Sequence, residues 1–392
     1  MTNTTKWVIG VVVVLVVILG FAAANTNNGG PNSDSSRTTD QNKPTGPVKL
    51  GVIAALTGDA AVYGETLRNV TQIAVDEINK SGGINGQQVE AIYEDGKCNG
   101  KDAASAMQKL VSVDKVQVVL GGFCSSESLA AVPIATQARV ALFSPGSSSP
   151  DLTNVSRFFA RNYPSDASQG VVLAEAAYGK KSFKSVAVMQ EQTPYAQGLF
   201  KVFNEKFTSL GGNVVKEEFP STVTDFRSQL TKLRAINPDA LFLDTQTPAV
   251  SSRILKQVQD MNWKPQIIIA DATIGDPATL TANAAILEGA IGAEFGVDPA
   301  NPKFQHLLSA YKDKYGKEPN YQSYVQTIYD AIYIYKDAIT AVGYDGEKVA
   351  DYLHRLSGWS GASGSVTIGA DGDRVGGHRL EIIQNGKPVV LQ

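Results

Sequence analysis

The chain has 392 residues, of which 43% are hydrophobic, and its formal net charge is −3 at pH 7. Because a single hydrophobic core rarely grows beyond about 250 to 300 residues, this length favours two folded domains. The lysines and arginines form no basic stripe with interleaved aromatic residues, so we expect no nucleic-acid partner.

The N-terminal segment, residues 1–24, indicates a membrane anchor or a signal peptide. Residues 7–24, WVIGVVVVLVVILGFAAA, are uncharged and follow Lys6, which would keep the N-terminus on the cytoplasmic side. The small residues 22–24 would suit signal-peptide cleavage, but an apolar run of about 18 residues is long for a signal peptide and just enough for a span. We favour an uncleaved anchor, and the absence of a following cysteine argues against a bacterial lipoprotein.

Residues 25–47 contain almost nothing apolar, which predicts a flexible linker that places the folded part outside the cytoplasm. Cys98 and Cys124 are the only cysteines. In an oxidising compartment an even pair is expected to form a disulfide bond. The alternative is two buried free thiols.

From Val48 onward, apolar strands alternate with amphipathic helices, which predicts a parallel, doubly wound α/β sheet. The first strands are expected at 48–56 and 89–93, and the first helices at about 61–80 and 101–113. The apolar run 116–120 then breaks at two glycines, and Ser125-Ser126 follow where the N-cap of the next helix belongs.

A further strand, 140–143, ends in the sequence SPGSSS at 144–149. Open α/β sheets bind ligands just outside the carboxyl ends of their strands, where freed backbone amides and helix N-termini favour anions. Serine hydroxyls add hydrogen bonds without charge. The two adjacent loops therefore predict a cradle for a small carboxylate, although glycine and serine clusters also simply end strands.

A second lobe of similar plan is expected after Asp151, because the alternation of helices and strands starts again. Its strands, expected at 185–189, 213–219, 240–244 and 266–270, end in polar loops at 190–195, 244–248 and 271–274. Two such lobes that face each other would enclose a cleft. Helices are expected again at 304–315 and 321–342, and short strands after 365.

Seven motifs, in order along the chain, resemble the type I periplasmic binding proteins, most closely the leucine/isoleucine/valine-binding branch. They are AALTGDAAVYGE (54–65), SGGINGQQVE (81–90), VLGGFCSSES (119–128), FSPGSSSPDLT (143–153), QTPYAQGL (192–199), ILKQ (254–257) and GADGDRVGG (369–377). The resemblance covers nearly all of residues 48–392. It implies two α/β lobes, 48–164 plus 295–370 and 165–294 plus 371–392, joined by three hinge crossings around one ligand cleft.

The resemblance also implies roles for individual residues. Ser125 and Ser148 would hold the α-carboxylate of an amino acid, and the Gly146 carbonyl and Asp271 would hold its α-ammonium. Pairing with Asp271 matters because a buried ammonium is costly unless it is compensated. The residues expected around the ligand side chain are aromatic: Tyr63, Phe123, Tyr195 and Tyr324.

Two departures from the family pattern affect the expected ligand. Family members often have a small aliphatic residue where Gly146 and Ser147 stand, and Gln246 or Thr247 could hydrogen-bond a polar side chain, which puts leucine itself in doubt. The family's disulfide falls on Cys98 and Cys124.

The function that the resemblance implies is an extracytoplasmic receptor of an ABC importer, which captures a branched-chain or related amino acid and presents it to the permease. The alternatives are a receptor for a separate signalling partner and a binder of a small amide or carboxylate. An enzyme is disfavoured, because no HExxH, Walker or GxSxG motif is present. We expect no cofactor or metal, and His306, His354 and His378 are expected to lie away from the cradle.

Overall fold

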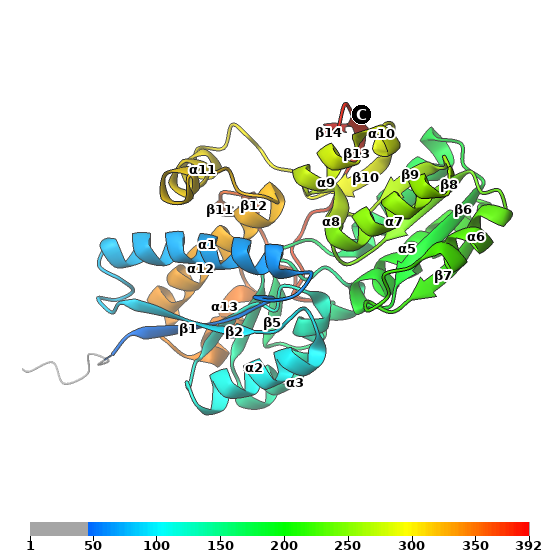
Figure 1. Cartoon of the computed structure of the whole chain (residues 1–392). Helices are drawn as coiled ribbons and strands as arrows, with labels where there is room; N and C mark the ends of the chain where they lie inside the picture. Colours follow the sequence, from blue (N-terminus) through cyan, green and yellow to red (C-terminus); the bar gives the residue numbers. More distant parts are fainter. Residues whose placement is uncertain (1–45, 392) are drawn as a thin grey trace, which may run out of the picture. The chain divides into compact units, whose positions relative to one another are not determined.

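Two separate, mainly parallel sheets organise the computed structural model, which describes residues 46–391 (Figure 1). The first sheet has the strand order β2-β1-β3-β4-β5, and every pair is parallel. Its strands are β1 (Val48–Ala54), β2 (Val89–Asp95), β3 (Val118–Leu120), β4 (Ala141–Ser144) and β5 (Phe159–Arg161).

Helices cover both faces of this first sheet. On one face α1 (Ala61–Lys80) packs beside α12 (Gln322–Val342), and on the other lie α2 (Gly100–Ser112) and α3 (Ser125–Ala138). Three more elements complete the first face although they come late in the chain: α11 (Pro302–Tyr315), α13 (Gly346–Leu353) and the hairpin β11 (Trp359–Gly361) and β12 (Gly364–Val366). This arrangement puts the carboxyl ends of β3 and β4 side by side.

The second sheet has the strand order β14-β13-β10-β9-β8-β6-β7. The strands are β6 (Ser185–Glu191), β7 (Asn213–Phe219), β8 (Ala240–Asp244), β9 (Gln266–Ile269), β10 (Ile291–Glu294), β13 (Arg379–Gln384) and β14 (Lys387–Val390). Only β13 and β14 run antiparallel to their neighbours. The chain therefore passes between the two sheets three times: after β5, after β10 and before β13.

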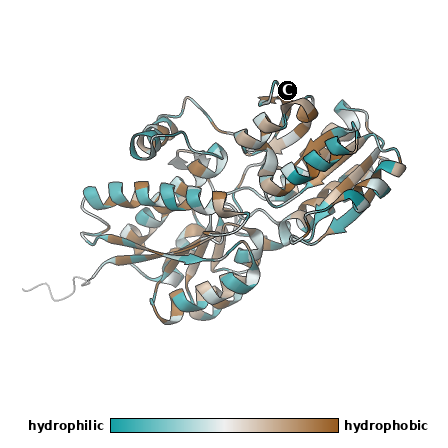
Figure 2. Cartoon of the chain, viewed as in Figure 1, coloured by the Kyte–Doolittle hydropathy of each residue, from teal (hydrophilic) through white to brown (hydrophobic). Residues whose placement is uncertain are grey.

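Alternating residues of the second sheet face opposite layers, as the two-residue period of a strand requires. Val186 and Val188 pack with α4 (Asp166–Glu175) and α5 (Pro194–Ser209), whereas Ala187 and Met189 pack with α6 (Arg227–Ala235) and α7 (Pro248–Asp260). Figure 2 shows the hydrophobic colour gathered on these strands. A strand buried on both faces reads as a continuous apolar run, which is why the sequence reveals it.

The prediction of an α/β fold with two doubly wound lobes is confirmed, and α1 has the predicted limits. The prediction for Ser125-Ser126 is wrong, because the N-cap of α3 is Cys124 and these serines occupy the first helical turn. The sequence also missed short elements: β5, β10 and α13, and the helices α8 (Asp271–Ile274), α9 (Pro277–Ala282) and α10 (Ala284–Leu287).

The anchor predicted at 7–24, and nearly all of the linker predicted at 25–47, lie outside the described residues. Within 46–391, no helix combines the length and the apolar character that a membrane span needs.

Candidate ligand-binding site

Hydrogen bonds tie together the two loops that follow β3 and β4. The Ser144 hydroxyl donates to the Gly122 carbonyl at 2.7 Å and accepts the Ser147 amide at 2.9 Å. The Ser125 hydroxyl accepts the Ser149 amide at 3.1 Å. Each serine hydroxyl thus satisfies backbone groups that the strand ends leave free, and the loops form one rigid cradle.

A buried arginine supports this cradle from behind. Arg161, at the end of β5, is fully buried and donates to the Ser149 carbonyl at 2.8 Å. Its guanidinium also pairs with Asp373, at 2.6 Å between Nε and Oδ1. Arg161 lies at the first passage between the sheets and Asp373 at the third. The pair therefore fixes the serine loop to both of these passages.

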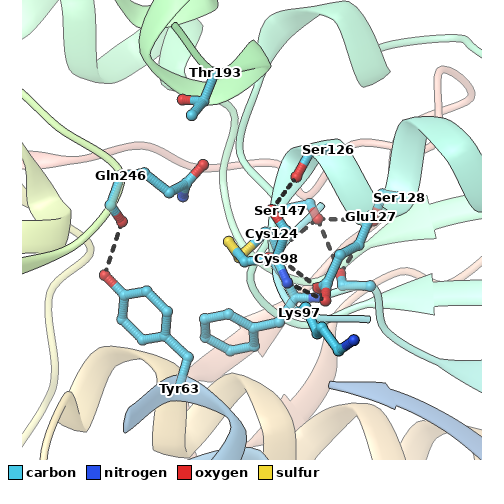
Figure 3. The surroundings of a disulfide bond; sticks show 12 residues. Tyr63, Lys97, Cys98, Cys124, Ser126, Glu127, Ser128, Ser147, Thr193 and Gln246 are labelled. Carbon is cyan, nitrogen blue, oxygen red and sulfur yellow. Dashed lines mark hydrogen bonds between the residues drawn. A yellow bond between two sulfur atoms is a disulfide. The ribbon is translucent and has the colours of Figure 1, made fainter. Parts of the chain in front are cut away.

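The Cys98–Cys124 disulfide predicted from the sequence is present, with the Cα atoms 5.2 Å apart (Figure 3). Beside it, the Glu127 carboxylate accepts the backbone amides of Phe123 and Cys124, both at 2.9 Å, and of Cys98 at 3.0 Å. Burial raises the pKa of Glu127 to about 7, in opposition to these amides. The disulfide and Glu127 together hold the loop that carries Phe123.

A pocket lies between this cradle and the loops of the second sheet, and residues from both sheets line it. The lining residues are Tyr63, Phe123, Cys124, Ser125, Gly146, Ser148, Tyr195, Gln246, Ala272 and Tyr324. The cavity measures about 10 Å³, which is room for about one water molecule. An amino acid can enter only if the two sides separate or side chains move.

Aromatic rings form the first-sheet wall of the pocket. The centroids of Tyr63 and Phe123 are 5.2 Å apart in a stacked pair, and Tyr324 meets Phe123 edge-on at 4.9 Å. A Cβ added to Gly146 would lie 2.8 Å from the Phe123 ring, so the ring occupies the space that a small aliphatic residue at 146 would need. This contact accounts for the glycine at position 146, one of the two positions in the first departure from the family pattern.

Asp271 lies just behind the pocket lining and is fully buried. Its carboxylate accepts the hydroxyls of Tyr163 at 2.9 Å, Tyr324 at 3.1 Å and Tyr195. The Tyr163 hydroxyl also lies 2.7 Å from Glu294. No lysine or arginine among the described residues forms an ion pair with Asp271, so its partners supply hydrogen bonds but no positive charge.

Two further groups, Asp166 and His378, lie beside Asp271. One acceptor atom from each of the three residues lies within 4.8 Å of the others, and all three residues are buried. Asp166 accepts the Ser148 hydroxyl at 2.7 Å through Oδ2, while its Oδ1 has no partner. Burial, followed by the negative charge of Asp271, raises the pKa of Asp166.

The tautomer of His378 follows from its neighbour Ser168. We assign the ring proton of His378 to Nδ1, which lies 2.7 Å from the Ser168 hydroxyl, because this hydroxyl can then donate to the Ser165 carbonyl while it accepts the His378 backbone amide. The buried Nε2 is then an acceptor without a partner. Burial lowers the pKa of His378 to about 4, which keeps the ring neutral.

The expectation that all three histidines lie away from the cradle is therefore wrong for His378. It shares the buried group with Asp166, whose other oxygen touches the cradle serine. Asp166 Oδ1 and His378 Nε2 are buried without a hydrogen-bond partner, whereas both Asp271 oxygens accept uncharged donors. Such a group attracts a cation, and its carboxylate oxygens and imidazole nitrogen would suit either an ammonium or a metal ion.

Of the eleven residues predicted to bind the ligand, eight line the pocket: Tyr63, Phe123, Ser125, Gly146, Ser148, Tyr195, Gln246 and Tyr324. Ser147 instead donates to the Gly122 carbonyl at 2.9 Å, and Thr247 caps α7 by accepting the Val250 amide. Asp271 is one layer behind. The contacts of all eleven with a ligand remain predictions.

The comparison with known proteins decides the family. The model of the periplasmic binding protein family matches residues 47–385. The chain belongs to this family. Among curated relatives, the Leu/Ile/Val-binding protein homolog 2 of Brucella abortus is 28% identical over 333 residues, which are 83% of this chain and 87% of the relative. The relatives found bear the names of binding proteins, not of enzymes.

Solved structures agree with the family assignment. The leucine-binding protein LivK of Thermotoga maritima is 30% identical, with a TM-score of 0.80, and the match covers 88% of this chain and 98% of that protein. LivJ of Streptococcus pneumoniae, solved with isoleucine, is 27% identical, with a TM-score of 0.78 and coverage of 87% and 97%. A benzoate complex of a Rhodopseudomonas palustris solute-binding protein shares the fold at 19% identity, a TM-score of 0.79 and coverage of 88% and 96%.

Proposed function

We propose that this chain is the extracytoplasmic receptor of an ABC importer, that it captures an α-amino acid between its two lobes, and that it delivers the ligand to a permease. The family supports a solute-binding role outside the cytoplasm. The names of LivK and LivJ, a leucine-binding protein and a transporter substrate-binding protein, support the transport role. Residues 7–24 would tether the receptor to the membrane.

The buried acceptor group is the observation that carries the amino-acid assignment. One ligand atom each from Asp166, Asp271 and His378 lies within 4.8 Å of the other two, so a single bound cation could meet all three residues. A primary ammonium has three N–H donors, one for each of three acceptors. The adjoining serine cradle, which suits a carboxylate, favours the ammonium of an amino acid over a metal ion.

The cradle supplies the complementary half of an amino acid. Ser125 lines the pocket at the N-terminus of α3, and Ser148 lines it in the loop after β4. Hydroxyls, amides and a helix end there favour a carboxylate. Neutral donors suit this role, because a cation there would pair with the neighbouring carboxylates instead. The two halves lie close together, since Ser148 also donates to Asp166.

Closure of the lobes is expected to accompany binding. Contacts already join the two sides, for example the Tyr63 hydroxyl with the Gln246 carbonyl at 3.1 Å and Arg253 with Asp59 at 2.7 Å. The ligand favours the closed form only by as much as it binds that form better. A cavity of about 10 Å³ is consistent with a form that closes tightly.

The aromatic wall leaves one alternative, a binder of a small carboxylate that lacks an ammonium, as in the benzoate-binding relative. Thermal-shift measurements on the purified full chain would decide between the two. Each amino acid is compared with its α-hydroxy acid, which keeps the carboxylate. At a ligand concentration about a hundred times Kd, binding adds roughly 2.7 kcal/mol of stability. A shift with an amino acid but not with its hydroxy acid supports the proposal, and the reverse refutes it.

A further inference from the structure

Gln246 contributes the polar group of the second-sheet side of the pocket, and its backbone is fixed at both ends. Its amide donates to Glu191 at 2.8 Å, and its carbonyl accepts the Tyr63 hydroxyl from the opposite lobe. The next residue caps α7. These contacts hold Gln246 at the pocket when the two sides are closed, and Figure 3 shows its side chain extending toward the side on which the Cys98–Cys124 disulfide lies.

The side-chain amide of Gln246 has an unused acceptor. Gln246 is 9% exposed and lines the pocket, and its Oε1 is buried without a hydrogen bond. Buried amide oxygens are rarely left in this state, because each has lost its bond to water. Asp244, just before the same loop, also has a buried carboxylate oxygen without a hydrogen-bond partner.

We propose that the ligand's side chain carries a hydrogen-bond donor that meets Gln246 Oε1, so the preferred ligands are polar amino acids and not leucine, isoleucine or valine. This inference rests on the proposed function, which places the α-amino and α-carboxylate groups in the cradle. A hydroxyl, carboxamide or amine satisfies the oxygen. An aliphatic side chain leaves it unpaired, and a side-chain carboxylate adds a further acceptor beside Glu191.

Isosteric pairs of amino acids test this selectivity with the unmodified full chain. Threonine is compared with valine, and asparagine with leucine, by titration calorimetry. A site built around a polar group rejects an analogue that cannot satisfy it. We expect the polar member of at least one pair to bind about tenfold more tightly or better, which corresponds to 1.4 kcal/mol.

A Gln246→Leu variant should reverse this preference, while Gln259→Leu, on the exposed face of α7, should keep it. Tighter binding of leucine or valine to the unmodified chain would overturn the inference and leave the proposed function standing. Failure of every α-amino acid to bind would overturn both. The comparison within the unmodified chain decides the question even if the Gln246→Leu variant does not fold.

Discussion

Replacement of Asp271 by asparagine tests the proposed ammonium-binding role of the buried acceptor group most directly. The substitution keeps the shape of the side chain and removes its charge. Asp271 is fully buried, and its hydrogen bonds come from three tyrosine hydroxyls and the Ala272 amide. Since none of these donors is charged, the ammonium of the ligand is the partner that would compensate the carboxylate.

The expected loss follows from this geometry. Removal of one member of a buried charge pair costs about 2 to 5 kcal/mol, because the remaining charge stays desolvated. Affinity for an amino acid should therefore fall by roughly 30-fold to several thousand-fold. A tyrosine hydroxyl can donate to the asparagine oxygen or accept from its NH2 group, so the fold should survive. Asp151→Asn, at an exposed position in the cradle loop, is the matched control and should bind normally.

Titration calorimetry with two ligands completes the design. The unmodified chain and the Asp271→Asn variant are each titrated with an amino acid and with its α-hydroxy acid analogue. The analogue should bind the unmodified chain much more weakly than the amino acid, so it is titrated at high concentration. The loss of affinity should appear only with the amino acid, because the analogue has no ammonium. An equal loss with both ligands would mean that Asp271 only supports the structure, and unchanged amino-acid affinity would refute its assignment altogether.

Three further predictions concern closure and stability. A Cβ at Gly198 would lie 2.8 Å from Pro150 of the opposite lobe, so Gly198→Ala should weaken ligand binding by about 1 to 3 kcal/mol in calorimetry. Burial raises the pKa of Glu127 from 4.5 to about 7, so the folded chain holds this proton more tightly than the unfolded chain. The resulting contribution to stability is complete below about pH 4.5 and is lost by about pH 7, a change of about 3 kcal/mol that Glu127→Gln should abolish in denaturant melts. The disulfide links cysteines 26 residues apart, and its removal by Cys98→Ser and Cys124→Ser should lower the free energy of unfolding by about 3.5 kcal/mol.

Each of these has a result that would contradict it. Unchanged affinity in Gly198→Ala would show that the two lobes do not approach as closely when ligand is bound. If Glu127→Gln left the difference in the free energy of unfolding between pH 5 and pH 8 intact, another group would be responsible for this pH dependence. A chain without cysteines that unfolds at the same denaturant concentration as the oxidised one would remove the stabilising role of the disulfide.

The fold could be predicted because its signals are local. Strands buried on both faces are continuous apolar runs, and amphipathic helices separate them, as at 48–54 and 61–80. The two loops of the cradle also lie close together in the sequence, at 119–128 and 143–153. The N-cap of α3 was misassigned because serine is the usual residue there, whereas Cys124 takes the position and Glu127 binds its amide.

The buried acceptor group of Asp166, Asp271 and His378 could not be predicted in full, because its members come from distant parts of the chain. Asp166 and His378 are 212 residues apart and meet only where the chain passes between the sheets. Neither stands in a pattern that marks it as buried. The same holds for Arg161, a fully buried cation whose partner Asp373 follows 212 residues later. Only the resemblance to a family indicated Asp271.

The position of Arg161 has a consequence for how binding and closure are linked. Its guanidinium contacts the Ser149 carbonyl of the cradle and Asp373 of the third passage, while its backbone belongs to the strand before the first passage. Asp166, just after that first passage, accepts the hydroxyl of Ser148. Rotation of the lobes about these passages must therefore move the groups that hold Ser148. The cradle and the buried acceptor group therefore change their relative positions as the lobes rotate, so we expect a ligand that engages both to favour the closed form.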